Sequence, residues 1–133
     1  MVGLVLVSHS PKLAEGVADV SRVMAAGCPV AAAGGADDGG FGTSFEKIKA
    51  AVKSVDGGDG VVILADMGSA VMTAEMVIEE LGRKDVVLAD CPIAEGAIAA
   101  SVASLCGDGL PDVKAKAEAA WDERKVESLK FKV

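Results

Sequence analysis

Four short runs of apolar residues alternate along the chain with longer segments whose apolar positions recur at helical spacing. The runs cover residues 2–7, 30–33, 61–64 and 86–89, and each is almost continuously apolar. Continuous runs of this length are typical of strands that are covered on both faces, as in parallel sheets. The pattern therefore predicts four buried strands separated by helices.

The segments between these runs carry signals for helix starts. Ser10 is a good N-cap residue, and Pro11 follows it at the first helical position. A second helix is expected to begin at a capping box in which Thr43 caps the helix and Glu46 reaches back. The five expected helices cover residues 11–26, 43–55, 69–81, 92–106 and 111–124.

This alternation of strands and helices predicts an α/β fold with an open, mostly parallel sheet and helices on both faces. Residues 126–133 differ from the other strands because lysines interrupt their apolar positions, and we expect a C-terminal edge strand there. Since a free edge tolerates little apolar content, this strand is expected to pair with a second copy in a homodimer. Without a linker or internal repeat, residues 1–133 are expected to form a single domain.

Composition narrows the class of partner. Hydrophobic residues make up 51% of the chain and charged residues 25%, which is typical of a globular protein. A net charge of −7 and 3% aromatic residues argue against nucleic acid, whose recognition needs basic patches and stacking platforms. The longest apolar region contains Glu95 and is too short for a bilayer, and the N-terminus does not resemble a signal peptide. We therefore expect a cytoplasmic protein without a membrane partner.

Candidate chemistry gathers where the predicted strands end. In open α/β sheets, ligands bind just beyond the carboxyl ends of the strands. Those ends carry Ser8-His9-Ser10, a glycine-rich loop over residues 34–44, and Asp66-Met67-Gly68-Ser69-Ala70. One histidine and three scattered cysteines offer no ligand cluster, so neither a metal nor a cofactor is expected.

The single histidine of the chain, His9, lies directly before the N-cap Ser10, where the positive end of a helix favours a negative group. A nucleophilic imidazole needs one free ring nitrogen and an acceptor that holds the other. Asp66, at the end of the third predicted strand, is the natural orienting carboxylate. The residues alone leave open that His9 is a solvated loop residue and Asp66 an acid at a helix start.

The sequence of the glycine-rich loop favours binding of a phosphoryl group over binding of a nucleotide. Residues 40–45 begin like a dinucleotide-binding motif but lack its last glycine, and the chain has no Walker A lysine. Backbone amides at a helix start can instead cradle a phosphoryl group, although an ordinary mobile loop is the alternative. The candidate phosphate-binding residues in this loop and after the third strand are Gly40, Gly42, Thr43, Gly68 and Ser69.

The chain resembles a known family in four stretches: GLVLVSHSPKLAEGV, GGADDGGFGTSFEKI, ADMGSAVMTAEM and CPIAEGAIAA. These are similar to the phosphotransfer subunits of dihydroxyacetone kinase, whose N-terminal domain is similar to mannose-type IIA domains of the phosphoenolpyruvate-dependent phosphotransferase system (PTS). The resemblance covers essentially the whole chain. The histidine motif and DMGSA are shared with the wider mannose-type family, whereas GGADDGGFGTS favours the dihydroxyacetone branch.

This resemblance implies a phosphotransferase component with the mannose-type IIA fold. His9 would be the phosphoryl acceptor, forming a tele-phosphohistidine, and Asp66 would orient its ring. HPr would be the donor, ADP bound on the DhaL subunit the acceptor, and DhaK an indirect partner in the phosphorylation of dihydroxyacetone. The residues themselves leave open which ring nitrogen of His9 reacts.

Three alternatives remain at this stage. The nearest is the IIA domain of a mannose-type sugar permease, which would pass the phosphoryl group to a IIB domain. A weaker alternative is a receiver-like signalling module phosphorylated on Asp66, although receivers need an acidic pair after the first strand. The third alternative is a regulatory module that only binds phosphate.

Overall fold

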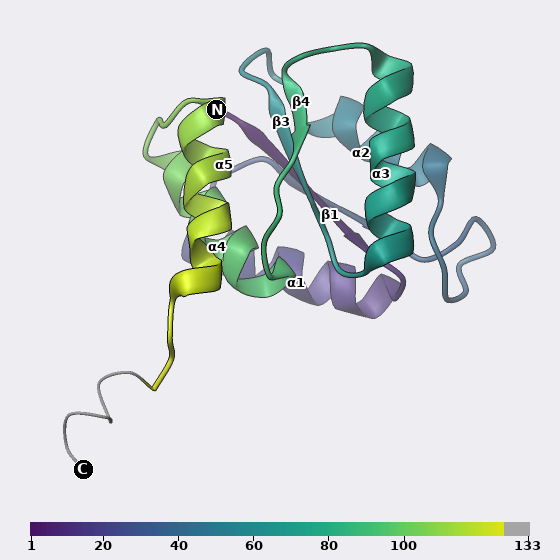
Figure 1. Ribbon diagram of the computed structural model, residues 1–133, viewed down its shortest axis with the longest axis horizontal. Helices are drawn as coiled ribbons and strands as arrows, with labels where there is room; N and C mark the ends of the chain where they lie inside the picture. The colour runs from purple at the N-terminus through teal and green to yellow at the C-terminus, as the bar shows by residue number, and fades with distance from the viewer. Residues whose placement is uncertain (127–133) are drawn as a thin grey trace.

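The computed structural model describes residues 1–126 of the chain and confirms the α/β class (Figure 1). Strands β1 (Gly3–Ser8), β2 (Val30–Gly34), β3 (Val61–Ala65) and β4 (Val86–Leu88) form one sheet in the order β2-β1-β3-β4. Every pair of neighbouring strands is parallel. The two central strands, β1 and β3, therefore end side by side at the same edge of the sheet.

Helices cover both faces of the sheet, as predicted. One face packs against α1 (Pro11–Met24), α4 (Ile93–Leu105) and α5 (Leu110–Glu118), and the other against α2 (Phe45–Val55) and α3 (Gly68–Leu81). Because successive strand residues point to opposite faces, each central strand serves both cores. The first core contains Leu4, Leu6 and Leu64, and the second contains Val5, Val7 and Ile63.

The start of α2 differs from the prediction. Its N-cap is Ser44, whose Oγ accepts a hydrogen bond from the backbone amide of Lys47 at 3.1 Å. The proposed capping box of Thr43 and Glu46 is therefore wrong by one residue. Both Thr43 and Ser44 are competent caps, and starting the helix at Phe45 releases the Thr43 hydroxyl for another contact.

The start of α1 is confirmed, since Ser10 Oγ accepts a hydrogen bond from the Leu13 amide at 3.2 Å. The last predicted helix ends early, because α5 stops at Glu118 and a short 3₁₀ helix, η1 (Ala119–Asp122), follows it. Of the expected edge strand over residues 126–133, Val126 lies in a turn and the remainder lies outside the described residues.

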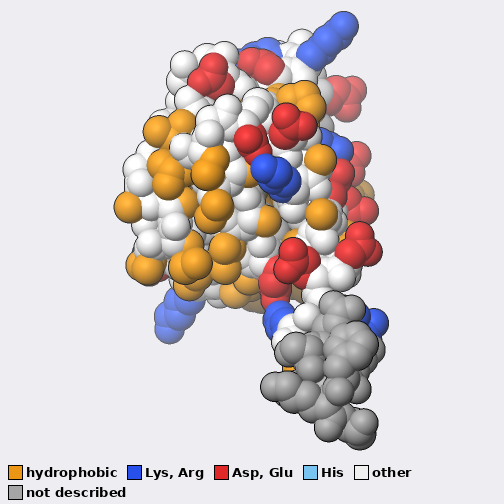
Figure 2. All heavy atoms as spheres, turned by 90° about the vertical axis from the view of Figure 1, so that its left-hand side faces the viewer, with side chains coloured by type: hydrophobic (Ala, Val, Ile, Leu, Met, Phe, Trp, Pro, Cys, Tyr) orange, Lys and Arg blue, Asp and Glu red, His pale blue; other side chains and the backbone are white. Residues whose placement is uncertain are grey.

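The alanine-rich helix α4 is confirmed but is not buried on every side. It has one charged residue, Glu95, and it packs between α1 and α5 on the sheet. Its outer side nevertheless exposes Val102 and Leu105. Figure 2 shows apolar side chains gathered over part of the surface on the side of the molecule where α4 and α5 lie. The scarcity of charged residues in α4 therefore has two causes: one side of the helix is buried against its neighbours, and part of its exposed side is apolar.

A close approach between β1 and the end of α2 generates a stability prediction. A Cβ atom at Gly3 would lie 2.4 Å from the carbonyl oxygen of Val55. Gly3→Ala should lower the free energy of unfolding by about 1–3 kcal/mol, because the strand or the helix must shift. Urea unfolding measures this change.

Gly16→Ala is the matched control, because nothing lies within 4 Å of the corresponding Cβ position on the exposed side of α1. It should raise the free energy of unfolding by about 0.5–1 kcal/mol, since alanine is the better helix former. Equal effects of the two substitutions would contradict the close packing at Gly3.

Candidate functional site

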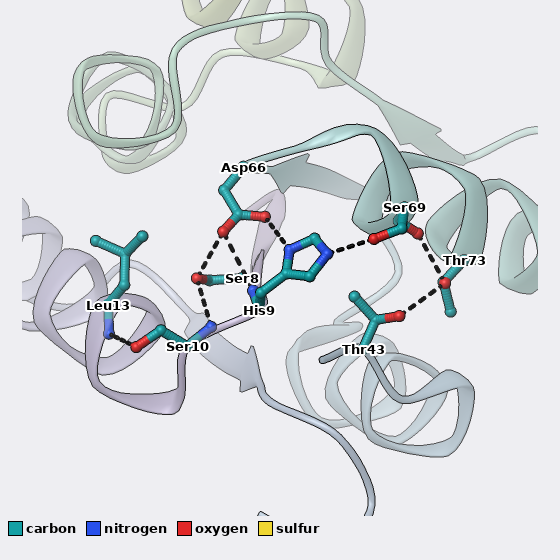
Figure 3. A network of polar contacts seen from close by, with 8 residues as sticks. All are labelled: Ser8, His9, Ser10, Leu13, Thr43, Asp66, Ser69 and Thr73. Atoms are coloured by element: carbon teal, nitrogen blue, oxygen red, sulfur yellow. Dashed lines mark hydrogen bonds and ion pairs between the residues drawn. The ribbon is translucent and has the colours of Figure 1, made fainter. Parts of the chain in front are cut away.

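The carboxyl ends of β1 and β3 bring His9 and Asp66 together (Figure 3). Val7 of β1 lies opposite Ala65 of β3, and the amide of Asp66 donates to the carbonyl of Val7 at 3.1 Å. His9 directly follows Ser8, the last residue of β1, and Asp66 directly follows Ala65, the last residue of β3, so the sheet fixes where both residues begin. The His9 and Asp66 side chains are only 10% and 9% exposed.

Both oxygens of the Asp66 carboxylate are engaged by the β1 end. Oδ1 lies 3.0 Å from His9 Nδ1, while Oδ2 accepts hydrogen bonds from Ser8 Oγ at 2.8 Å and from the His9 amide at 3.1 Å. A carboxylate accepts but does not donate, so Nδ1 carries the proton in this contact. The arrangement fixes the orientation of the imidazole ring.

The charge of Asp66 follows from the same contacts. Burial alone would raise the pKa of the Asp66 carboxyl, but the hydrogen bonds from the His9 ring, the Ser8 hydroxyl and the His9 amide outweigh burial. Together they hold the pKa of Asp66 below its ordinary value, because each donor favours the charged form. The carboxylate beside His9 is therefore stable as an anion.

The other ring nitrogen faces the start of α3. The Ser69 hydroxyl contacts His9 Nε2, as Figure 3 shows. Gly68 and Ser69 are the first residues of α3, and a helix leaves its first amides without intrahelical partners. These amides and the positive end of the helix favour an anion close to Nε2.

Thr43 lies next to this group through a contact with α3. Thr73 Oγ1 donates to the carbonyl of Ser69 at 2.9 Å, and it lies 3.1 Å from Thr43 Oγ1 (Figure 3). Since Thr73 has given its proton to Ser69, Thr43 is the donor in the contact between the two threonines. The start of α2 is thereby linked to the start of α3.

The glycine-rich loop contacts His9 differently from the predicted cradle. The Gly42 amide donates to the carbonyl of His9 at 2.9 Å, and the Gly40 amide donates to Asp38 Oδ1 at 2.8 Å. Both amides are therefore already paired. The loop supports the backbone of His9, while the hydroxyl that contacts Nε2 comes from Ser69 in the first turn of α3.

Sequence reasoning did not single out Ser8 or Phe41. Ser8 donates to Asp66, and its position as the last residue of β1 was the available signal. The Phe41 ring lies beside the imidazole with a centroid distance of 5.3 Å and an interplanar angle of 35°. An aromatic residue within a glycine-rich loop, in a chain with only three phenylalanines, was the corresponding signal.

Two observations concern the described residues 1–126 alone. They contain no group of three or more His, Cys, Asp or Glu side chains placed to hold a metal ion. None of their helices combines the length and the hydropathy needed to cross a bilayer.

Comparison with known proteins identifies the class. Residues 3–114 match the EIIA-man family model, described as the PTS system fructose IIA component. The match spans most of the chain and includes both His9 and Asp66. The chain belongs to the EIIA-man family.

The curated relatives include DhaM subunits of dihydroxyacetone kinases, described as phosphoryl donor or phosphotransferase subunits. The chain is 40% identical over 111 residues to such a subunit of PEP-dependent dihydroxyacetone kinase 1 from Listeria innocua, covering 84% of this chain and 87% of that one. It is 33% identical over 116 residues to the DhaM subunit of Lactococcus lactis, covering 87% and 93%. With DhaM of Klebsiella michiganensis it shares 37% identity over 134 residues, which is 96% of this chain but only 28% of the relative. The chain thus spans 28% of the Klebsiella michiganensis relative and 87% of the Listeria innocua relative.

Solved structures support the fold. A protein of unknown function, EF1359, superposes with a TM-score of 0.78 at 30% identity, covering 88% of this chain and 92% of that one. A sigma-54 interaction domain protein from Enterococcus faecalis gives a TM-score of 0.70 at 17% identity, covering 99% and 97%. The second likeness concerns the fold alone.

The Ser8 contact yields a prediction for the charge of Asp66. Ser8→Ala removes one donor and should raise the pKa of Asp66 toward its ordinary value of about 3.9, measured by a carboxyl ¹³C NMR titration. When the pKa of a carboxyl is lower in the folded chain than in the unfolded chain, the carboxylate stabilises the folded state at every pH above the unfolded pKa. This contribution to stability is lost as the pH falls through the folded pKa. The stability deficit of Ser8→Ala should therefore be full near about pH 6 and shrink below about pH 4.

Ser10→Ala is the control from the same segment. It removes the cap on Leu13, at a cost of about 1 kcal/mol, but leaves every donor to Asp66 in place. An Asp66 pKa that stays the same in Ser8→Ala, or that rises equally in Ser10→Ala, would contradict the proposed origin of the shift.

Proposed function

We propose that this chain is the phosphoryl carrier of a PTS-dependent dihydroxyacetone kinase. In this proposal His9 takes a phosphoryl group from phospho-HPr and passes it to ADP bound on a DhaL subunit. One observation carries the proposal: Asp66 holds Nδ1 of His9 while Nε2 faces the start of α3. The relatives named as phosphoryl donor or phosphotransferase subunits of dihydroxyacetone kinases support it.

The geometry favours Nε2 as the nucleophile. With its proton on Nδ1 and directed at Asp66, the imidazole keeps a lone pair on Nε2. As the Nε2–phosphorus bond forms, the bond from phosphorus to the donor breaks and the donor keeps its electron pair. The product is a tele-phosphohistidine at His9, whose ring Asp66 still orients.

Ser69 is proposed to change partners during transfer. Its hydroxyl contacts Nε2 in the unphosphorylated protein and must leave that nitrogen when phosphorus approaches. It can then donate to a phosphoryl oxygen together with the first amides of α3, Gly68 and Ser69, and the Thr43 hydroxyl can join them only by giving up its hydrogen bond to Thr73. Phosphoryl transfer has a loose transition state, so positioning and hydrogen-bond donors are the main contributions of the protein.

Gly40 and Gly42 have a supporting role in this proposal. Their amides are paired with Asp38 and with the His9 carbonyl, so they hold the loop against His9. We also propose that the chain acts in the cytoplasm as a homodimer, without a cofactor of its own. DhaK takes part only indirectly, through the ATP that forms on DhaL.

A second candidate is the IIA domain of a mannose-type sugar permease. The matching family model, whose description names a fructose IIA component, favours keeping it. The two candidates share His9 and differ in the acceptor, which would be a IIB domain instead of ADP on DhaL. Phosphorylation of Asp66, as in a receiver, is disfavoured because both carboxylate oxygens are engaged and the side chain is buried.

Variants of His9 test the carrier function. Incubation with enzyme I, HPr and phosphoenolpyruvate should give the wild type one acid-labile, base-stable phosphate. His9→Ala and His9→Gln should take up none, because the chain has no other imidazole, and both should keep the fold. Asp66→Asn should be labelled more slowly, since the amide orients the ring less well and cannot balance its charge.

The acceptor decides between the two candidates. The labelled wild-type protein should lose its phosphate to ADP-loaded DhaL and not to free ADP. Discharge to a IIB domain but not to ADP-loaded DhaL would replace the kinase assignment with the permease one. Acid-labile phosphate on His9→Gln would show that another residue is the acceptor and overturn the carrier site.

A further inference from the structure

Phe41 lies at the reacting group but has no part in the proposed chemistry. Phe41 is 75% exposed, although its ring lies beside the His9 imidazole at a centroid distance of 5.3 Å. Large aromatic side chains are usually buried, and aromatic residues, including Phe, are enriched in protein–protein interfaces. The exposed part of Phe41 is therefore a candidate contact for a partner protein.

The loop around Phe41 is built to hold it in place. The Ala36 amide donates to the carbonyl of Gly40 at 2.9 Å, and the Gly39 amide donates back to the carbonyl of Ala36 at 3.0 Å. On the other side of Phe41, the Gly42 amide is tied to the His9 carbonyl at 2.9 Å. Gly39 has a φ of 85°, a conformation that favours glycine. A contact residue fixed in advance loses little conformational freedom on binding.

The two acidic residues of this loop, Asp37 and Asp38, are exposed, and each carboxylate is hydrogen-bonded within the loop. The Asp37 carboxylate accepts a hydrogen bond from the Ser44 hydroxyl, and Asp38 accepts one from the Gly40 amide. The residue after Asp66, Met67, adds a second apolar side chain that is half exposed. The exposed surface near His9 therefore combines the apolar side chains of Phe41 and Met67 with the two acidic side chains of the loop.

The geometry of transfer brings a protein donor close to Phe41, because the Phe41 ring lies beside the reacting imidazole. A reacting phosphorus must come within about 3–3.5 Å of Nε2. The groups that surround this phosphorus on a protein are then brought against the ring that lies beside the imidazole. A small-molecule phosphoryl donor has no protein surface around its phosphorus atom and so makes no such contact with Phe41.

We propose that Phe41 is the partner-recognition residue of this site. It binds the apolar surface that surrounds the transferable phosphoryl group on a donor protein, and it leaves the reactivity of His9 unchanged. This inference rests on the proposed function, because it concerns the protein that phosphorylates His9. It assigns the glycine-rich loop a role in docking in addition to its support of the His9 backbone.

The test compares two donors of different size. Phospho-HPr is the protein donor, and phosphoramidate phosphorylates imidazole groups without a docking surface. Phe41→Ala should lower kcat/KM with phospho-HPr by about 10-fold or more, as expected for a central aromatic contact. Its rate with phosphoramidate should equal that of the wild type, and Phe41→Leu should recover part of the rate with phospho-HPr.

Val23→Ala is the matched control, because Val23 is 81% exposed in the last turn of α1, far along the helix from His9. It should leave both rates unchanged. Equal loss of Phe41→Ala with both donors would overturn the inference and make Phe41 a positioning residue for the imidazole. Unchanged rates with both donors would overturn it as well. If the wild type takes no phosphate from phospho-HPr but reacts with phosphoramidate, the proposed function itself fails.

Discussion

The contact between the Asp66 carboxylate and Nδ1 of His9 is the constraint on which the site depends. It exists because β1 and β3 are parallel neighbours whose ends are in register, with Val7 opposite Ala65. The same strand ends lead into α1 and α3, so one arrangement of the backbone places two helix starts beside the imidazole. Apolar residues on both faces of β1 and β3 hold this register.

The two ring nitrogens of His9 have different surroundings, and this asymmetry determines which nitrogen is held and which is available to react. On the Nδ1 side, Asp66 is anchored by Ser8 and by the backbone amide of His9. On the Nε2 side, Ser69 offers a single hydroxyl that can rotate away. One side therefore fixes the ring, while the other can be exchanged for an incoming group.

The sequence predicts the sheet, the order of the elements and the pair of His9 and Asp66, because apolar runs locate strands and ligands bind at strand ends. It does not select between adjacent caps, since Thr43 and Ser44 carry equivalent hydroxyls and only the geometry of α2 decides. It also places the amides of Gly40 and Gly42 in a phosphate cradle. Their actual partners depend on the folded loop, where Gly42 meets the carbonyl of a residue far away in sequence.

The most direct test of this account is the position of the proton on the His9 ring. Because the chain has a single histidine, ¹⁵N NMR of the imidazole reports on the site without assignment. In the neutral ring of the unphosphorylated protein, the account predicts a proton on Nδ1 and a lone pair on Nε2, and Asp66→Asn should weaken this preference. A neutral ring protonated on Nε2 in the wild type would contradict it.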